Sequence, residues 1–301
     1  MTDLHWRSDD GKAELWHADA LDPEAVAAAM QGRTADALIV DAPYSARTQE
    51  AHEAGRMTPE QLARWGEKMA ERARRPVTAD QRARAKYERK TGKSGSRRSG
   101  IEYAPWSGSD VERFVDTWSP LTTGWLCSLT DHTLFPDWES AMSVNGRVTF
   151  QPLPFVETGS RVRMCGDGPS SWSCWLAVGR PKGQPYCKWG ALRGAYVMPG
   201  ERAFNGVSGS ERIVGGKPVR GMLLIVDDYS RHGDLVVDPC CGAGTTGVAA
   251  RTLGRRFIGC DTNREHLDIS ARRIGAAREQ LTMALGEPAM GEQEELWRMS
   301  Q

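Results

Sequence analysis

The sequence lacks an excess of basic charge, because its 39 lysines and arginines are matched by 39 aspartates and glutamates. That balance argues against a chain that binds nucleic acid over its whole surface. No run of apolar residues is long enough to cross a bilayer, and the first residues lack the apolar segment of a signal peptide. We therefore expect a cytoplasmic protein without a membrane partner.

Paired cysteines are also missing. The seven cysteines are odd in number, include no Cys-x-x-Cys pair, and are accompanied by six scattered histidines. Neither a disulfide framework nor a zinc site is indicated, so no metal is expected. The adjacent Cys240 and Cys241 are expected to be reduced and to fill small apolar space, since nothing near them in sequence would activate a thiolate.

What the sequence does contain is centred on residues 235–246, Leu-Val-Val-Asp-Pro-Cys-Cys-Gly-Ala-Gly-Thr-Thr. An apolar run ends at Asp238, Gly242 and Gly244 predict a tight bend, and Thr245 begins a helical pattern. Glycine permits positive φ and lets the backbone approach a ligand, and the N–H groups of the helix start face that ligand. The segment predicts a strand, a glycine turn and a helix.

A second apolar strand is predicted at 256–261, and it ends in Asp261. In a βαβ unit, an acidic residue at the end of the second strand is placed to hold ribose hydroxyls. The two segments together indicate a nucleoside-binding unit. A purely structural turn would explain the glycines but would leave Asp238 and Asp261 without a role.

A second chemical centre follows the predicted strand 35–41. This strand ends in Asp41 and is followed by Ala42, Pro43 and Tyr44. Open α/β sheets bind their ligands at the carboxyl ends of strands, so these residues are candidates for a site. The alternative is an ordinary strand-to-loop turn, in which aspartate and proline are common.

These motifs carry a resemblance to a known family. Asp41-Ala-Pro-Tyr44 resembles the Asp-Pro-Pro-Tyr catalytic motif of amino-methylating DNA methyltransferases, and residues 238–246 resemble their S-adenosylmethionine motif. The catalytic motif precedes the cofactor motif, as in the β group of the family. His17-Ala-Asp-Ala-Leu21 and Lys217-Pro218 resemble two further segments of that group, and the resemblance covers roughly residues 12–45 and 120–275.

The resemblance implies an α/β fold of the Rossmann-like class I methyltransferase type, with a mixed, mostly parallel sheet and helices on both faces. Inserted helical and target-recognition segments are expected in addition. The expected parts are a catalytic domain of residues 1–45, 101–180 and 217–285, a basic helical insertion at 46–100, a target-recognition region at 181–216, and an acidic tail at 286–301.

The resemblance also implies the roles of individual residues. S-adenosylmethionine would be bound by Asp19, Ala20, Lys217, Pro218, Asp238, Pro239, Cys240, Gly242, Gly244, Thr245, Thr246 and Asp261. The target base would be held by Asp41, Ala42, Pro43 and Tyr44.

The chemistry explains these residue types. An exocyclic amine is a poor nucleophile because its lone pair is conjugated into the ring. The Asp41 carboxylate and the Ala42 carbonyl would each accept a hydrogen bond from an N–H of the amine and so localise the lone pair on nitrogen. Transfer is then direct and in line, and positioning supplies most of the rate. The base must be flipped out of a duplex, and Tyr44 offers it a stacking face. Ala42 replaces the family's proline, which would loosen the loop but keep the carbonyl.

Two regions carry candidate DNA contacts. In the basic insertion these are Arg74, Arg75, Arg82 and Arg84, and in the 181–216 region they are Lys188 and Arg193, which alternate with aromatic residues. Arginines of this kind grip phosphates, and basic residues among aromatics suit DNA contact. The alternatives are a solvated charged helical pair for the first region and a surface excursion held by its aromatics for the second.

The sequence thus favours methylation of double-stranded DNA at N6 of adenine, because N4-cytosine enzymes more often have serine where Asp41 stands. N4-cytosine transfer is the nearest alternative. A methyltransferase of proteins or small molecules, and a catalytically weak DNA-binding protein with the same fold, are the others. The chain would be a monomer or homodimer, with a paired restriction endonuclease as a candidate partner. Asp131-His132 is expected to be structural, since direct transfer needs no histidine.

Overall fold

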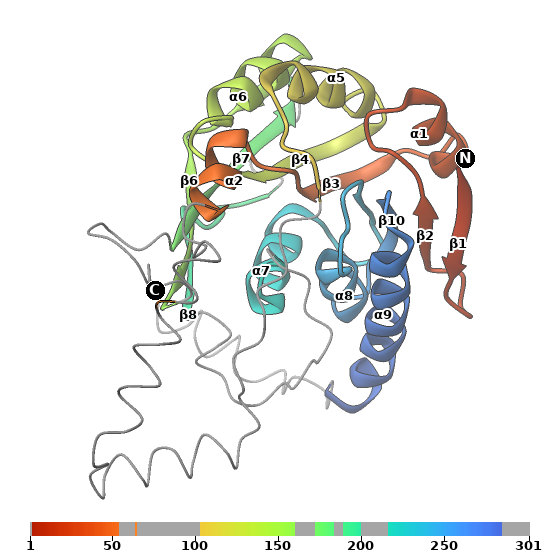
Figure 1. Cartoon of the computed structure of the whole chain (residues 1–301). Helices are drawn as coiled ribbons and strands as arrows, with labels where there is room; N and C mark the ends of the chain where they lie inside the picture. The colour runs from red at the N-terminus through yellow and green to blue at the C-terminus, as the bar shows by residue number, and fades with distance from the viewer. Residues whose placement is uncertain are drawn as a thin grey trace, which may run out of the picture.

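A mixed β-sheet is the central layer of the protein (Figure 1). The computed structural model describes residues 2–53, 64, 103–159, 172–183, 189–199 and 216–284 of the chain. The strands in these ranges are β1 (Asp3–Arg7), β2 (Ala13–His17), β3 (Ala35–Asp41), β4 (Thr122–Thr130), β5 (Arg147–Thr149), β6 (Leu153–Thr158), β7 (Ser173–Pro181), β8 (Tyr196–Pro199), β9 (Leu235–Asp238) and β10 (Arg256–Asp261).

The strand order is β1-β2-β10-β9-β3-β4-β7-β6-β8, with β5 paired to β7. Strands β2, β10, β9, β3 and β4 run parallel. Strand β1 is antiparallel to β2, and β7 is antiparallel to β4, β5 and β6. The central parallel strands are continuous apolar runs because both of their faces are covered, which is why β3 is buried along most of its length. The predicted mixed, mostly parallel sheet is confirmed.

Helices cover both faces of the sheet (Figure 1). They are α1 (Pro23–Met30), α2 (Ala46–Glu53), α5 (Gly108–Trp118), α6 (Phe135–Val144), α7 (Val219–Tyr229), α8 (Thr245–Thr252) and α9 (Arg264–Ala284). One hydrophobic core contains side chains of α1, α5 and α6, and a second contains side chains of α7, α8 and α9. The two cores lie on opposite faces, so the predicted helix–sheet–helix layering is confirmed.

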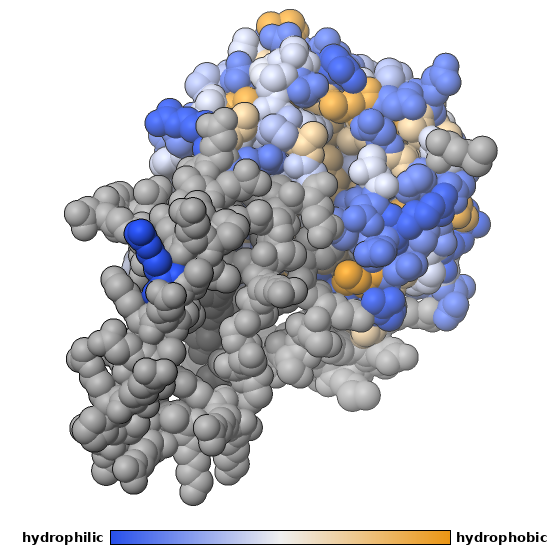
Figure 2. Space-filling view, viewed as in Figure 1, coloured by the Kyte–Doolittle hydropathy of each residue, from blue (hydrophilic) through white to orange (hydrophobic). Residues whose placement is uncertain are grey.

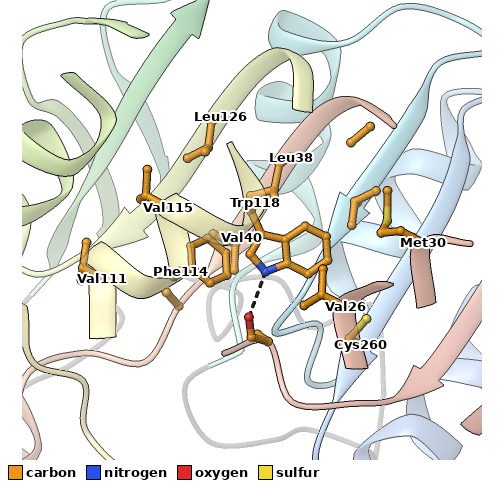
Figure 3. Close-up of a cluster of buried hydrophobic side chains, with 14 of the residues drawn as sticks. Val26, Met30, Leu38, Val40, Val111, Phe114, Val115, Trp118, Leu126 and Cys260 are labelled. Atoms are coloured by element: carbon orange, nitrogen blue, oxygen red, sulfur yellow. Dashed lines mark hydrogen bonds between the residues drawn. The ribbon is translucent and has the colours of Figure 1, made fainter. Parts of the chain in front are cut away.

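Trp118, at the end of α5, is central to the first core (Figure 3). Its ring is fully buried beside Val26 and Met30 of α1. Its indole Nε1 donates a hydrogen bond of 3.0 Å to the backbone carbonyl of Ala20, in the loop between β2 and α1. A buried tryptophan needs a partner for its N–H, and this bond ties that loop to the core.

Some elements were not predicted from the sequence. Strands β1, β6 and β8 and helix α7 are additions, and α2 lies at the start of the segment that we expected to be an insertion. Strand β6 contains Pro154, which weakens a strand pattern. Strand β8 lies inside the predicted target-recognition region and joins the edge of the sheet next to β6.

On the face shown in Figure 2, hydrophilic residues dominate the coloured part and hydrophobic residues are scattered singly. None of the helices in the described ranges has both the length and the apolar character needed to span a membrane.

Candidate active site

The two predicted chemical centres meet at the middle of the sheet. Strands β9 and β3 are parallel neighbours, with Leu38 opposite Val237. Helix α8 follows β9 on one face, while α5, which precedes the next strand after β3, lies on the other. Where the helices next to two neighbouring parallel strands lie on opposite faces of the sheet, a crevice opens at the carboxyl ends of those strands. Asp41 and Asp238 end these strands, so both carboxylates lie at this edge.

The glycine turn has the geometry that its sequence predicts. Gly242 has φ of 49° and Gly244 has φ of 72°. A Cβ on Gly244 would lie 2.8 Å from the Ser270 Oγ, whereas a Cβ on Gly242 would meet no atom within 4 Å. Gly244 therefore permits close packing of the turn against α9, and Gly242 leaves open space in front of it. Gly244 is also the N-cap of α8.

Asp238 is buried directly beneath this turn, with 2% of its surface exposed. Burial raises its pKa to about 7, and the nearby carboxylates of Asp41 and Asp261 act in the same direction. Hydrogen bonds from the Thr246 side chain and from the Cys240 N–H oppose the shift only in part. A cationic group placed beside this carboxylate would favour its ionised form. Among the described residues, no lysine, arginine or histidine forms an ion pair with Asp238.

Asp261 lies beside the turn at the end of β10. One carboxylate oxygen accepts a bond of 2.9 Å from the Gly242 N–H, and the other accepts one of 2.8 Å from the Asn263 N–H. The Ala18 N–H donates to the Asp261 carbonyl at 3.1 Å, which places the following residues Asp19 and Ala20 close to this strand end. The structure thus brings the predicted nucleoside-binding residues together.

Cys240 and Cys241 pack beside the turn, Cys241 being buried and Cys240 partly buried against the first core. Burial raises the pKa of both thiols well above the usual value. Both side chains are therefore uncharged packing groups, as predicted.

Asp41 is bound by a lysine from a distant part of the chain. The Lys217 ammonium donates to both carboxylate oxygens of Asp41 at 2.8 Å. The Tyr44 hydroxyl lies 3.4 Å from one of these oxygens, and the Lys217 Nζ lies 4.9 Å from the centroid of the Tyr44 ring. Burial opposes the charge of Lys217, but the Asp41 carboxylate outweighs it and raises the lysine pKa above its usual value. Lys217 therefore lies at the predicted base site, although the resemblance implied a cofactor role.

Asp131, at the end of β4, holds the loop that follows Tyr44. Its Oδ2 accepts hydrogen bonds from the Ser45 N–H at 2.9 Å and from the hydroxyls of Ser45 and Thr48 at 2.5 Å each. Its Oδ1 accepts the N–H groups of Thr133 and Leu134 at 3.0 Å. The predicted structural role of this strand end is confirmed, and its link to the loop after Tyr44 was missed. No local sequence signal connects residues 86 positions apart.

Cys174 was also missed. It is the second residue of β7 and lies next to Tyr44. Burial raises the pKa of its thiol, while the Lys217 charge and a Tyr44 hydrogen bond partly oppose this. Cys174 reaches the site because β7 pairs with β4, with Trp175 opposite Thr130. This pairing is not readable from the local sequence.

Most of the predicted DNA contacts lie outside the described residues, namely Arg74, Arg75, Arg82, Arg84 and Lys188. Arg193 is described. Its guanidinium forms an ion pair with Asp228 of α7, which also accepts a hydrogen bond of 2.7 Å from the Tyr196 hydroxyl. Arg193 is thus held by α7, and 42% of its side chain remains exposed.

The sheet order, the switch point and the glycine turn together define a Rossmann-like protein of the class I methyltransferase type. A family profile described as DNA methylase, of the N6/N4 type, matches residues 79–272, more than half of the chain. The chain therefore belongs to the N6/N4 DNA methylase family, which uses S-adenosylmethionine. The match begins after Asp41–Tyr44, so it does not include those residues.

Known proteins agree with this assignment. The type II methyltransferase M2.DpnII of Streptococcus pneumoniae is 50% identical over 63 residues, which are 21% of this chain and 24% of that protein. The chain thus matches about a quarter of the length of its curated relatives.

Two solved structures share the fold. The M1.HpyAVI–SAM complex has a TM-score of 0.54 and 17% identity, over 87% of this chain and 98% of that one. PvuII DNA methyltransferase, described as cytosine-N4-specific, has a TM-score of 0.53 and 10% identity, over 93% of each chain.

Proposed function

We propose that this protein transfers a methyl group from S-adenosylmethionine to N6 of adenine in double-stranded DNA. The observation that carries the proposal is the meeting of Asp41 and Asp238 at the ends of adjacent parallel strands. Asp41 heads the motif expected to hold the base, and Asp238 precedes the glycine turn expected to hold the cofactor. A switch point that places both at one edge lets a donor and an acceptor meet.

The residues of the turn fit the cofactor. The sulfonium of S-adenosylmethionine supplies an activated methyl group when the cofactor is bound. Asp238, buried and with its pKa raised to about 7, is suited to a cationic group of such a ligand. The Asp261 carboxylate at the end of β10 is suited to ribose hydroxyls, and the space in front of Gly242 admits the ligand to the backbone. Asp19, Ala20 and Thr245 would complete this side of the site.

On the base side, the Asp41 carboxylate would accept a hydrogen bond from one N–H of the exocyclic amine, and the Ala42 carbonyl would accept one from the other N–H. This withdraws the amine lone pair from the ring and directs it at the methyl group. Tyr44 would stack on a base that has been flipped out of the duplex. After transfer, the methylated amine loses one proton, which the Asp41 carboxylate or water accepts. No covalent intermediate with the protein is required.

Adenine is proposed over cytosine because aspartate heads the motif, and N4-cytosine transfer by the same residues is the second candidate. The PvuII enzyme, which shares the fold, is cytosine-N4-specific by its description, so the fold fits either base. The similarity to M2.DpnII favours a place in a restriction–modification system with a paired endonuclease.

The test is to incubate the purified protein with methyl-labelled S-adenosylmethionine and unmethylated genomic DNA, digest the DNA to nucleosides and identify the labelled one by mass. We expect labelled N6-methyladenine. Labelled N4-methylcytosine would overturn the base assignment and keep the mechanism. Cofactor binding without any labelled nucleoside would contradict duplex DNA as the substrate.

Asp41→Ala provides the matched variant. Because Asp41 would act on the amine and not on the cofactor, this variant should lose at least about 100-fold in transfer rate. Its affinity for S-adenosylmethionine, measured by calorimetry, should stay within about threefold of the original. Transfer at an unchanged rate would remove Asp41 from the reaction.

A further inference from the structure

The Lys217–Asp41 ion pair lies at the place where the target amine would bind. Lys217 lies two residues before the start of α7, and Asp41 ends β3, so 176 positions of sequence separate them. Both oxygens of Asp41 receive the ammonium at 2.8 Å, and only 10% of the lysine side chain is exposed. The pair is therefore created by the packing of α7 against the sheet.

The orientation of a carboxylate plane at the end of a strand is set by its neighbours. The last torsion of aspartate is broad, so an unrestrained carboxylate samples many planes. A single ammonium between its two oxygens fixes that plane. Each carboxylate oxygen can accept a second bond, so an amine N–H can still approach while the lysine stays in place.

The position of Lys217 over Tyr44 adds a second constraint. Its Nζ lies 4.9 Å from the centroid of the Tyr44 ring, within the range of a cation–π contact. One ammonium thus fixes the acceptor Asp41 and the stacking face of Tyr44 relative to each other. An error of about 1 Å in such a relation costs on the order of 100-fold in rate.

The charge of Lys217 also relieves a concentration of carboxylates. The charges of Asp41 and Asp261 both act on Asp238, so the three acids lie within electrostatic reach of one another. A cation bound to Asp41 reduces their mutual repulsion.

We propose that Lys217 is a positioning residue that acts through Asp41, and that it does not bind the cofactor. This inference rests on the proposed function, because it assigns Lys217 to the same methyl-transfer site. It departs from the resemblance, which placed Lys217 and Pro218 with the cofactor residues.

The experiment is a double-mutant cycle with Lys217→Met, Asp41→Asn and the double variant, in the full-length chain. Three quantities are measured for each protein: the transfer rate at saturating cofactor, the dissociation constant for S-adenosylmethionine, and Tm. Lys12→Met is the control, because Lys12 is exposed and lies just before β2, at the amino-terminal ends of the parallel strands and away from Asp41.

We expect Lys217→Met to lower the saturated rate by about 30-fold or more, while the cofactor dissociation constant changes by less than about threefold. In the Asp41→Asn background the same change should cost less than about threefold in rate. Lys217→Met leaves Asp41 without its partner and lowers Tm, and the double variant should recover part of that loss.

A cofactor dissociation constant raised about tenfold or more, with the saturated rate retained, would overturn the inference. So would rate and Tm losses that simply add in the double variant. If the wild-type protein transferred no methyl group to DNA, the proposed function would fail, whereas the Tm cycle and the cofactor titration would still test the Lys217–Asp41 coupling. If Lys217→Met did not fold, Lys217→Arg should keep Tm and cofactor affinity but lose about tenfold in rate, and an unchanged rate would refute positioning.

Discussion

The buried carboxylate of Asp238 makes the stability of the fold depend on pH. Burial and the neighbouring carboxylates raise its pKa in the folded protein to about 7, from the ordinary aspartate value of about 3.9. Below about pH 4 the aspartate is protonated in both the folded and the unfolded states. Between about pH 4 and pH 7 the unfolded chain releases the proton while the folded one keeps it. The free energy of unfolding therefore falls as pH rises through this window, by an amount on the order of 4 kcal/mol.

Asp238→Asn replaces this titrating carboxyl with a neutral amide of similar size. Removing the titrating group should raise Tm relative to the original protein above pH 7 and leave the two nearly equal near pH 4. Denaturant melts at several pH values measure this difference directly. A wild-type stability that rose between pH 5 and pH 7 relative to the variant would contradict the assigned direction of the shift.

The same residue predicts the pH dependence of cofactor binding. A cationic ligand favours the ionised carboxylate, so its affinity should increase by about tenfold between about pH 6 and pH 8. Calorimetric titration with S-adenosylmethionine should show this increase, and Asp238→Asn should bind more weakly and with a flatter profile. A steep profile retained in the variant would place the titrating group elsewhere.

At the scale of secondary-structure elements, Asp131 joins the end of β4 to the loop that follows Tyr44 and to the start of α6. It accepts five hydrogen bonds, three of them from backbone N–H groups. Truncation would leave those buried donors without their partner, and each such loss is costly. The loop that follows Tyr44 would lose its anchor.

Asp131→Ala should therefore lower the free energy of unfolding by about 3 kcal/mol and the transfer rate by at least about tenfold. The cofactor dissociation constant should change little, since the bonds of Asp131 do not touch the glycine turn. Asp116→Ala is the control, because Asp116 makes one exposed hydrogen bond, to the Asn145 amide. Its loss should cost no more than about 1 kcal/mol in a urea melt. Equal costs for the two substitutions would contradict the anchoring role.

The elements also show what local sequence could predict. Strands β3, β9 and β10 were predicted because each is an apolar run closed by an aspartate. Helix α7 was missed, although its buried residues Met222, Ile225, Val226 and Tyr229 have helical spacing. Strand β6 was hidden by Pro154, which pairs with Trp175 in an antiparallel ladder. Short strands near the edge of a sheet have weak sequence patterns, because their burial depends on neighbouring strands.

At the scale of the whole molecule, the fold determines which distant residues meet. The sequence and its resemblance predicted that Asp41, Asp238 and Asp261 serve one site, because each ends a strand of a parallel sheet. The pairing of Lys217 with Asp41 and of Asp131 with Ser45 could not be predicted. Each pair depends on strand order and helix packing across many intervening residues. Local patterns thus locate the chemistry, and the tertiary arrangement decides which partner each group has.

Under the proposed function, the whole molecule has to hold DNA although its net charge is zero. Affinity for DNA must then come from a local concentration of basic residues, and the sequence places one at 72–98. Each phosphate contact releases condensed counterions and contributes about 0.9 to the slope of log affinity against log salt. The four arginines of the predicted contact set would contribute up to about 3.6.

Reversing the charge of Arg74, Arg75, Arg82 and Arg84 together should therefore weaken DNA binding strongly at low salt and reduce the slope by about that amount. Titrations of a fluorescent duplex at several salt concentrations measure both quantities, and calorimetry checks that cofactor affinity is retained. Lys12→Glu is the control, since this exposed lysine lies at the amino-terminal end of the parallel strands, away from Asp41. If each arginine reversal reduced affinity and slope by no more than Lys12→Glu does, DNA attraction would follow total charge, and the basic segment would have no special part in holding the substrate.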